Sequence, residues 1–595
     1  MTPPLPWQGL TQWRILDTDF GNGDAFFSFW QLWQADAQRP RMLHYVALSK
    51  NAPSQADWRR LAQCEANLNE PSQALAKHWF GLLPGFHRFL LSQGHVVLTL
   101  CIGATLPLLR QQQFAADSIF LRESTRLPDG DLIWLAKALA ACSQRGTRLQ
   151  AIRPPATHSS SVLLAALQHC GFTIANTLTT TDCEHLIAHY EPAWTLKNTR
   201  ATRFCVATPV GRCAVIGAGL AGASVAAALA RRGWQVHVHE QAANPAAGAS
   251  GLPVGLIAPY VSKDDSALSQ LSRAGVRLML QQAKALLEAG ADWAPVGVLE
   301  RHIGGTPSLP GNWPDAGHAW STLARPALPP DAWRTGFDTA RDLWHAQAAW
   351  LKPAALVHAW LNQSGVQFTA GHAVARICRQ QGQWTLKNSQ GTVLDSADRV
   401  VIANASAATL LLQALSHDYP HLANDLKRVP AMHGMRGQLS WGRHADAPSA
   451  AFAPFGVNGS GSLIAGVPTE LGLAWFAGSS YQPADQVERG EAENHLRNLQ
   501  HLQLLLPTLA NELAAKFIAG QLNAWKGTRC ISADRLPAVG ALDAAAQSGL
   551  WLCAGMGSRG LSLSMLCAEI LAAQWCAEPL PVEAKLAQLL AALRC

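Results

Sequence analysis

The sequence lacks the cysteine patterns of a metal-binding or disulfide-rich protein. Its 13 cysteines are scattered, with no Cys-x-x-Cys pair and no cluster of cysteine and histidine at metal-ligand spacing. Such patterns mark zinc sites and, in small secreted domains, disulfide frameworks. We therefore expect no metal site, and we expect the cysteines to be buried thiols in a reducing compartment.

Segments that would direct the chain into a membrane are also missing. Residues 1–13 have neither the charged start nor the apolar stretch of a signal peptide. The longest mostly apolar run, residues 96–109, contains Pro107 and is too short to span a bilayer. There is no internal repeat or low-complexity tract. The sequence therefore predicts a cytoplasmic protein without a membrane partner.

Charged residues are scarce, at 15%, while hydrophobic residues make up 49%. This balance excludes a disordered chain and is typical of well-packed globular domains. Because 595 residues are too many for one hydrophobic core, several domains are expected. The net charge of +7 permits an acidic partner such as a nucleic acid without requiring one.

A domain boundary is expected at residues 191–210, where Glu191-Pro192, polar residues and Thr208-Pro209 separate two patterned regions. Residues 1–190 alternate strand-like and helical apolar runs, which predicts an α/β domain. Residues 211–595 form a second α/β unit. In the first region, strands are expected at 43–48, 96–102 and 118–121, and helices at 25–33, 133–141 and 161–170.

The second region opens with the most informative segment of the chain. Gly217 allows a tight turn out of a short apolar strand, and Gly219 lets the backbone approach a pyrophosphate at the N-terminus of the next helix. Gly222 lets that helix pack closely on the strand. Glu240 ends the following strand and is placed to bind an adenosine ribose, which disfavours NADP. Together these features predict a dinucleotide-binding fold. The strands are expected at 213–216 and 234–239, and the helix at 223–232.

Two further small-residue segments favour a flavin over a nicotinamide. The loop Gly248-Ala-Ser250-Gly251 lets the backbone run alongside a bulky cofactor. Near the C-terminus, Gly555-Met-Gly557-Ser558-Arg559-Gly560 leads into a helical run at 561–573. This second helix N-terminus suits the anionic pyrimidine end of a reduced flavin, and a nicotinamide enzyme does not need it. The sequence therefore predicts FAD.

These segments resemble the glycine oxidase, sarcosine oxidase and D-amino acid oxidase superfamily. The segments 527–540, 557–560 and 566–571 further resemble the oxidoreductase half of the MnmC family, which are bifunctional tRNA 5-methylaminomethyl-2-thiouridine biosynthesis proteins. The similarity covers essentially all of residues 210–595. It implies an FAD-binding Rossmann-like domain with an inserted antiparallel-sheet substrate domain, roughly residues 265–345 and 430–525. It also implies a cofactor site that includes Ser250, Gly251, Val374, Gly555, Gly557, Ser558 and Gly560.

The resemblance also implies a reaction and a partner. In this family the oxidoreductase half removes the carboxymethyl arm from the carboxymethylaminomethyl group of a wobble uridine in tRNA, leaving an aminomethyl group and glyoxylate. Arg529 and Arg559 match the positions of substrate-carboxylate arginines in glycine oxidase relatives, a role that suits a planar guanidinium. Alternatively, either arginine pairs with Asp534 or Glu569 in a surface role.

By the same resemblance, residues 1–190 correspond to a Rossmann-like methyltransferase that uses S-adenosylmethionine. The loop Phe20-Gly21-Asn22-Gly23-Asp24 keeps the outline of the family's glycine loop. However, Leu48-Ser49-Lys50 replaces the acid that would bind the ribose, and hydroxyl or ammonium groups are poorer acceptors. Arg122 stands where the catalytic aspartate is expected, and Glu123 could substitute only if the loop shifts.

Two more departures concern the same half. The basic segment expected near residues 176–186 carries no positive charge, and the N-terminal stretch of the family is expected to be missing. We therefore predict a degenerate methyltransferase-type domain, kept as a packing partner or tRNA platform, in which binding of S-adenosylmethionine is doubtful. A fully bifunctional chain is the alternative.

Other interpretations of the second half stay open. One keeps the flavin chemistry but makes the substrate a free amino acid or small amine, and another is a tRNA-binding module with a vestigial flavin fold. Lys526 and Tyr481 are further candidates for the mouth of the site.

Overall fold

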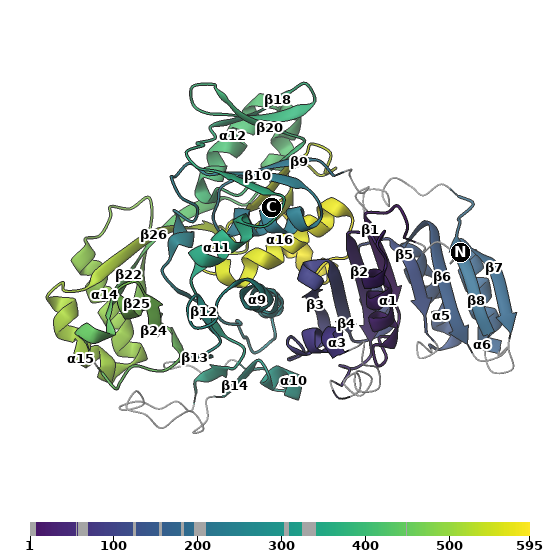
Figure 1. Ribbon diagram of the computed structural model, residues 1–595, viewed down its shortest axis with the longest axis horizontal. Helices are drawn as coiled ribbons and strands as arrows, with labels where there is room; N and C mark the ends of the chain where they lie inside the picture. Colours follow the sequence, from purple (N-terminus) through teal and green to yellow (C-terminus); the bar gives the residue numbers. More distant parts are fainter. Residues whose placement is uncertain are drawn as a thin grey trace. The chain divides into compact units, whose positions relative to one another are not determined.

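The computed structural model divides into two compact units (Figure 1). It describes residues 7–54, 56, 69–122, 127–153, 158–179, 184–194, 210–302, 309–323, 341–447 and 449–594. Unit 1 comprises Met1–Pro209, Arg231–Gly233 and Glu569–Gln588, and unit 2 comprises Val210–Ala230, Trp234–Ala568 and Leu589–Cys595. Most of the expected linker, residues 195–209, lies outside the described residues. Among the described residues, no helix is long and apolar enough to cross a bilayer, and all nine cysteines are free thiols.

Unit 1 is built on an eight-stranded mixed sheet in the order β3-β4-β2-β1-β5-β6-β8-β7. The five central strands are parallel, whereas β3, β7 and β8 pair antiparallel to their neighbours. The strands are β1 (Gln12–Asp17), β2 (Met42–Ser49), β3 (Gly85–Leu91), β4 (Val96–Ile102), β5 (Ala116–Leu121), β6 (Ser143–Arg153), β7 (Phe172–Thr179) and β8 (Glu184–Tyr190). The helices are α1 (Asp24–Ala35), α3 (Asn69–Ala76), α4 (Thr105–Arg110), α5 (Asp129–Ala141) and α6 (His158–His169).

Alternation along the central strands fills a hydrophobic core on each face of this sheet. Ile15 and Tyr45 point to the core that contains the aromatic residues of α1. Their neighbours Leu16 and Val46 point to the core that contains α4, α5 and α6. A sheet with both faces covered needs apolar residues at nearly every strand position, which is why these strands read as continuous apolar runs.

Unit 2 contains a six-stranded sheet in the order β17-β10-β9-β21-β28-β27. All of its pairings are parallel except that between β27 and β28. The strands are β9 (Arg212–Ile216), β10 (Gln235–His239), β17 (Val366–Thr369), β21 (Arg399–Ile402), β27 (Ala538–Ala541) and β28 (Leu550–Ala554). A small antiparallel sheet accompanies it, formed by β18 (Arg376–Gln380), β19 (Gln383–Lys387) and β20 (Val393–Ala397).

A second large sheet of unit 2 has eight strands in the order β14-β15-β13-β23-β24-β25-β22-β26, and all its pairings except β13–β23 are antiparallel. Its strands are β13 (Val298–Glu300), β14 (Ser321–Leu323), β15 (Leu343–His345), β22 (Met432–Arg443), β23 (Gly456–Gly459), β24 (Gly461–Thr469), β25 (Gly472–Pro483) and β26 (Asn523–Ser532). Another three-stranded sheet consists of β11 (Gly255–Ile257), β12 (Trp293–Ala294) and β16 (Ala349–Leu351).

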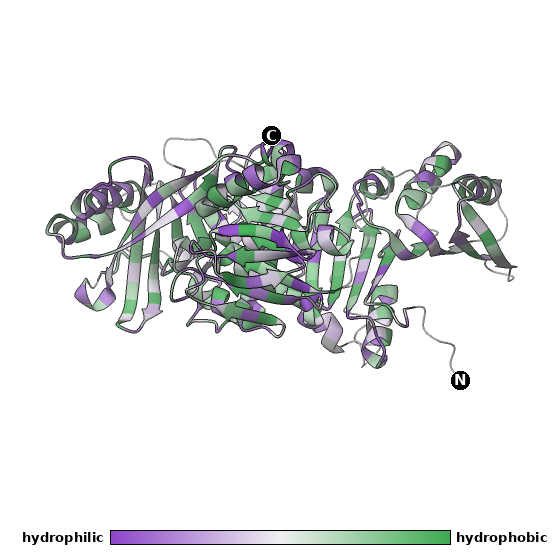
Figure 2. Ribbon diagram, turned by 90° about the horizontal axis from the view of Figure 1, so that it is seen from above, coloured by the Kyte–Doolittle hydropathy of each residue, from purple (hydrophilic) through white to green (hydrophobic). Residues whose placement is uncertain are grey.

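Helices α14 (Glu491–Leu505) and α15 (Pro507–Ile518) cover one face of the large antiparallel sheet (Figure 1). Trp475 and Ala477 of β25 pack into a core with the leucines of these helices. Phe476, which lies between them, points to the other face together with Leu439 and Ile464. Residues 474–477 of β25 are therefore all hydrophobic, and residues of high hydropathy are green in Figure 2.

The remaining helices of unit 2 include α9 (Ala267–Leu286), α10 (Asp315–His318), α11 (Pro353–Leu361), α12 (Ala408–Asp418), α13 (Ala423–Leu426) and all of α8 (Leu220–Arg231) except its last residue. Helix α16 (Gly560–Cys576) begins in unit 2, its residues from Glu569 on belong to unit 1, and α17 (Ala584–Leu589) follows in the chain. The predicted α/β fold class is confirmed. The strand, glycine turn, helix and second strand expected between residues 213 and 239 are confirmed as β9, α8 and β10. The helices and strands expected in the first half are also present.

Candidate active site

A cleft of about 870 Å³ opens in unit 2, within the range of roughly 300–1,000 Å³ found for small-molecule and cofactor sites. One end is lined by residues that directly follow β9, β10, β21 and β28, at the carboxyl edge of the parallel sheet. Ligands of open α/β sheets bind at this edge. The other end is lined by Leu439, Ile464 and Phe476 of the large antiparallel sheet. The cleft is therefore lined by residues of both large sheets of unit 2.

The glycine turn after β9 has the backbone geometry that the sequence predicts. Gly217 has a φ of +105°, which only glycine adopts without strain, and its N–H donates to the carbonyl of His239 at 2.8 Å. A Cβ on Gly222 would lie 1.9 Å from the carbonyl oxygen of Gly217, so no side chain fits there. Gly217 and Gly219 line the cleft, whereas Gly222 is buried in the packing of α8 on β9.

Glu240 lies at the end of β10 and lines the same cleft. One carboxylate oxygen accepts the N–H of Ala218 at 2.9 Å, and the other accepts the N–H of Ala242 at 3.0 Å. These bonds fix the carboxylate beside the glycine turn. Each oxygen keeps a second lone pair with which it can accept a ribose hydroxyl.

The loop after β10 reinforces the glycine turn. Ser250 Oγ accepts the N–H of Leu220, at the first residue of α8, at 2.9 Å. Ser250 lines the cleft, but Gly251 does not, and a Cβ on Gly251 would lie 2.6 Å from the carbonyl oxygen of Ala246. The role of Gly251 is therefore packing of the loop. The other expected cofactor residues, Val374, Gly555, Gly557, Ser558 and Gly560, all line the cleft.

The residues present fit a dinucleotide that carries a flavin. The N-terminus of α8 offers free N–H groups for a diphosphate, and no acidic residue lies in its first turn. Asn404, the second residue after β21, lines the cleft, and its buried side-chain oxygen has no hydrogen-bond partner among the described residues. A buried acceptor of this kind is costly unless a ligand supplies a donor. Asn404 was not predicted as a site residue, although its place after a buried parallel strand is a signal for one.

Two arginines also line the cleft. Arg529 lies on β26, and its Nη1 donates to the hydroxyl of Tyr481 at 2.6 Å while its Nη2 donates to Ser479 Oγ at 3.3 Å. The guanidinium also lies 4.8 Å from the ring centroid of Tyr481. Arg559 precedes α16, with its guanidinium 5.7 Å from the ring centroid of Tyr260. Tyr260 was not assigned a role from the sequence. Each arginine is thus held by an aromatic ring and keeps donors for a ligand.

The proposed ion-pair partners of these arginines are engaged elsewhere. Asp534 binds Arg594, with a shortest N–O distance of 2.7 Å. Among the described residues, neither Arg529 nor Arg559 forms an ion pair with a carboxylate. Glu569 is completely buried in unit 1, where it pairs with three arginines: Arg88, Arg231 and Arg232.

Of the two further candidates for the mouth of the site, Tyr481 lines the cleft and Lys526 does not. Tyr481 lines the cleft and is 47% exposed. Lys526 does not line it: its ammonium pairs with Glu491 at 3.2 Å, and it borders a separate cavity of about 190 Å³ that also includes Arg436. A role of Lys526 at the main cleft therefore has no support in this geometry.

In unit 1, the position of the expected catalytic aspartate is occupied by an ion pair. Arg122 binds both oxygens of Asp17, at 3.0 and 2.9 Å, and Tyr45 donates to the same carboxylate at 2.6 Å. The hydrogen bonds that Arg122 donates to Asp17 raise the pKa of Arg122, so the guanidinium is a fixed cation. The expected ribose-binding position falls at Ser49, the last residue of β2, whose hydroxyl donates to the backbone oxygen of Asn51. Glu123 and residues 180–183 lie outside the described residues.

Comparison with known proteins identifies relatives over nearly the whole chain. The model of the FAD dependent oxidoreductase family matches residues 212–574. The tRNA 5-methylaminomethyl-2-thiouridine biosynthesis bifunctional protein MnmC of Albidiferax ferrireducens is 48% identical, with 99% of this chain and 94% of the relative covered. The protein of the same name from Polaromonas naphthalenivorans is 43% identical, with 99% and 91% covered. Among solved structures, glycine oxidase from Geobacillus kaustophilus is 19% identical with a TM-score of 0.46, covering 60% of this chain and 93% of that one.

Proposed function

Since this chain belongs to the MnmC family of bifunctional tRNA-modification proteins, and through residues 212–574 to the FAD dependent oxidoreductases, we propose that it oxidises the carboxymethylaminomethyl group on the wobble uridine of tRNA. The products are the aminomethyl-uridine and glyoxylate. A tRNA substrate also implies a cytoplasmic location.

The observation that carries this proposal is the pair of arginines in the cleft. Arg529 and Arg559 line it without a carboxylate partner among the described residues. A carboxylate is the ligand that a planar guanidinium binds best, through two parallel hydrogen bonds. The substrate therefore carries a carboxylate, which the carboxymethylaminomethyl group provides.

The residues around the arginines position the reacting carbon. Arg529 is oriented by Tyr481 and Ser479, so a carboxylate bound to it has a fixed direction. Leu439, Ile464 and Phe476 form an apolar wall that excludes water and strengthens the ionic contact. When bound, FAD would supply a two-electron oxidant for the C–H bond between nitrogen and carboxylate, and hydrolysis of the resulting imine would release glyoxylate.

The cofactor would be held by the glycine turn and its neighbours. The N–H groups at the start of α8 would bind the diphosphate, Glu240 would accept the ribose hydroxyls, and Asn404 would offer a buried acceptor. The turn from Gly555 to Gly560 places the N-terminus of α16 at the cleft, where it favours negative charge on the flavin ring.

The test uses the FAD-loaded protein and tRNA isolated from cells that lack it. We expect mass spectrometry of the wobble nucleosides to show loss of the carboxymethylaminomethyl form and a matching yield of glyoxylate. Parallel reactions contain glycine or sarcosine in place of tRNA. If these small amines bleach the flavin and tRNA is not converted, the substrate is a free amine and the proposal is wrong. A protein that cannot take up FAD would instead point to a tRNA-binding module.

We further propose that unit 1 does not transfer a methyl group in this chain. The observation is the Asp17–Arg122 ion pair, which fixes a cation at the position where the chemistry needs a free carboxylate. The test supplies aminomethyl-uridine tRNA and labelled S-adenosylmethionine to the full chain. We expect no label in the tRNA. Label transfer that depends on unit 1 would show a fully bifunctional enzyme.

A further inference from the structure

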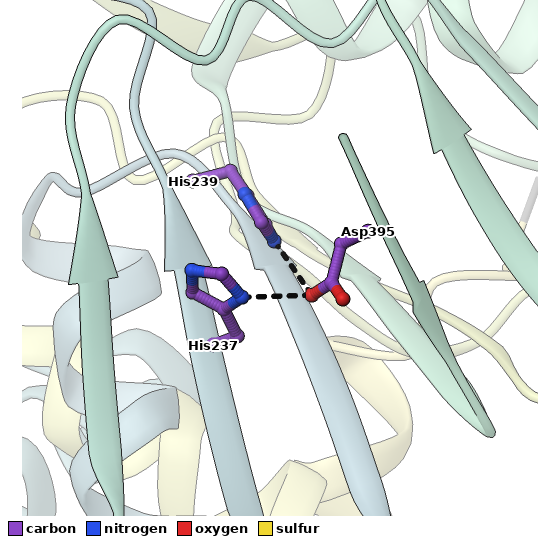
Figure 3. A group of neighbouring side chains, drawn as sticks. All are labelled: His237, His239 and Asp395. Atoms are coloured by element: carbon purple, nitrogen blue, oxygen red, sulfur yellow. Dashed lines mark hydrogen bonds and ion pairs between the residues drawn. The ribbon is translucent and has the colours of Figure 1, made fainter. Parts of the chain in front are cut away.

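Three side chains from two strands of unit 2 converge on one point (Figure 3). His237 and His239 lie two residues apart on β10, and Asp395 lies on β20. Residues i and i+2 of a strand point to the same face, so the two imidazoles lie side by side with ring centroids 4.0 Å apart. His237 Nδ1 lies 2.8 Å from Asp395 Oδ2, and His239 Nε2 lies 3.0 Å from the same oxygen.

The three atoms form one face of a coordination polyhedron. They all lie within 4.8 Å of one another. In a tetrahedral zinc site with bonds of about 2.0–2.1 Å, the ligand atoms are roughly 3.3 Å apart. The nitrogen–oxygen distances therefore need to grow by only about 0.3–0.5 Å to admit an ion. The side chains of His237, His239 and Asp395 are 15%, 0% and 8% exposed, so the point is sheltered but reachable from the side of His237.

Each ligand is held through its other polar atom. His237 Nε2 lies 2.8 Å from Thr369 Oγ1, and His239 Nδ1 lies 3.0 Å from His372 Nδ1. Asp395 Oδ1 accepts from Arg212 at 2.9 Å, which leaves Oδ2 to face the imidazoles. This is the arrangement of protein metal sites, in which the second ring nitrogen of a histidine ligand is bonded to a neighbour that fixes the tautomer.

The chemical class of the ion follows from the donors. Two neutral imidazoles and one carboxylate suit late first-row divalent ions such as zinc, whereas magnesium and calcium prefer oxygen ligands. Asp395 supplies the negative charge, and the guanidinium of Arg212, half exposed, is the cation that faces it. Three protein ligands and one water give the four-coordinate geometry that zinc favours.

We propose that His237, His239 and Asp395 form a binding site for a divalent transition-metal ion, with zinc as the expected occupant. The ion ties β10 to β20, since its ligands come from both strands. The site lies at the edge of the cofactor cleft, because His239, the next residue Glu240 and His372 all line that cleft. Bound zinc therefore fixes the strand that presents Glu240. The role is structural, and it does not depend on the substrate of the enzyme.

The experiment measures zinc directly in untagged, full-length, FAD-loaded protein. After chelation and return to metal-free buffer, the protein is equilibrated with zinc chloride, and bound zinc is counted by elemental mass spectrometry. We expect one equivalent of zinc more in the wild type than in Asp395→Asn or His237→Gln, with magnesium unable to replace it. Thr369→Val keeps the ligands but removes the acceptor of His237, and we expect a loss of zinc affinity of about 10- to 100-fold.

His417→Gln is the matched control, since this histidine is 89% exposed and pairs with Asp418 rather than with a residue of the cluster. It should keep the full zinc content. Retention of FAD and an unchanged circular dichroism spectrum establish that each variant is folded. If Asp395→Asn does not fold, the zinc content of His237→Gln tests the proposal, because His237 is the most exposed of the three ligands. Equal zinc in the wild type and both ligand variants would overturn the proposal and leave a hydrogen-bonded histidine cluster only.

Discussion

Gly557 donates its backbone N–H to the carbonyl oxygen of Cys530 at 2.8 Å. Met556 also forms an antiparallel bridge with Ile531. These contacts tie the turn that carries Arg559 to the strand that carries Arg529, although the two lie in separate segments of the sequence. The two guanidiniums are therefore positioned by one backbone-bonded unit, which supports their joint action on one carboxylate.

The first prediction concerns Arg529. Arg529→Lys keeps the positive charge but loses the planar fork, so one charge-assisted hydrogen bond is lost. At roughly 1.5–3 kcal/mol for such a bond, kcat/KM for tRNA should fall about 10- to 100-fold. Arg443→Lys, at an exposed ion pair with Asp446 outside the cleft, is the control and should retain activity. Steady-state assays of glyoxylate release measure both, and equal activity of the two variants would exclude Arg529 as a substrate ligand.

The second prediction concerns the close packing of α8 on β9. In Gly222→Ala the new Cβ would lie 1.9 Å from the carbonyl oxygen of Gly217, so the helix must move away from the strand. Because the same turn holds the diphosphate, we expect purified protein with little or no FAD. Gly490→Ala is the control, since a Cβ there meets nothing within 4 Å. The ratio of flavin to protein absorbance gives the result, and full flavin content in Gly222→Ala would contradict this account of the turn.

The third prediction concerns Asn404. Its buried side-chain oxygen has no partner among the described residues, so bound FAD is expected to supply a donor. Asn404→Ala removes a hydrogen bond worth about 1 kcal/mol, so the Kd for FAD should rise roughly fivefold. Fluorescence titration of apoprotein with FAD measures the change. Asn523→Ala, at an exposed position on β26, should leave the affinity unchanged. Tighter binding by Asn404→Ala would show that the oxygen faces no ligand.

The fourth prediction concerns pH and the buried carboxylate of unit 1. Burial by itself would raise the pKa of Glu569, but Arg232, Arg231 and Arg88 overcome this effect and hold the pKa at about 2, below the ordinary 4.5. A carboxyl group with a lowered pKa stabilises the fold fully above its unfolded value, and this stability is lost as the pH falls toward the folded value. The melting temperature should therefore drop as the pH is lowered from about 4.5 towards 2.

Glu569→Gln tests the same carboxylate at neutral pH. The substitution removes the negative charge shared by Arg88, Arg231 and Arg232, while Arg232 keeps its ion pair with Glu578. Breaking a buried ion pair costs about 3–5 kcal/mol. Differential scanning calorimetry should show a lower melting temperature for the transition of unit 1. Glu470→Gln, at an exposed residue between β24 and β25, serves as the control. A melting temperature equal to that of the control would mean that the network does not stabilise the unit.

Short-range patterns in the sequence were sufficient for the cofactor end of the site. The turn from Gly217 to Gly222, Glu240 and the turn from Gly555 to Gly560 each lie within one continuous segment, where the strand, helix and glycine positions dictate local geometry. The alternation of apolar strands and helices likewise predicted the α/β class, because the strands of a parallel sheet covered on both faces are nearly continuous hydrophobic runs.

What the sequence determined by itself is the set of local elements and the residue types that each of them presents. Only the tertiary structure decided which distant residues meet: Arg529 with Tyr481, Glu569 with three arginines, and Asp395 with His237 and His239. The His-x-His pair on β10 is visible in the sequence, but its carboxylate comes from a strand more than 150 residues further along. The physical reason is that side-chain contacts across sheets depend on how strands are paired and packed, and no local pattern specifies that pairing.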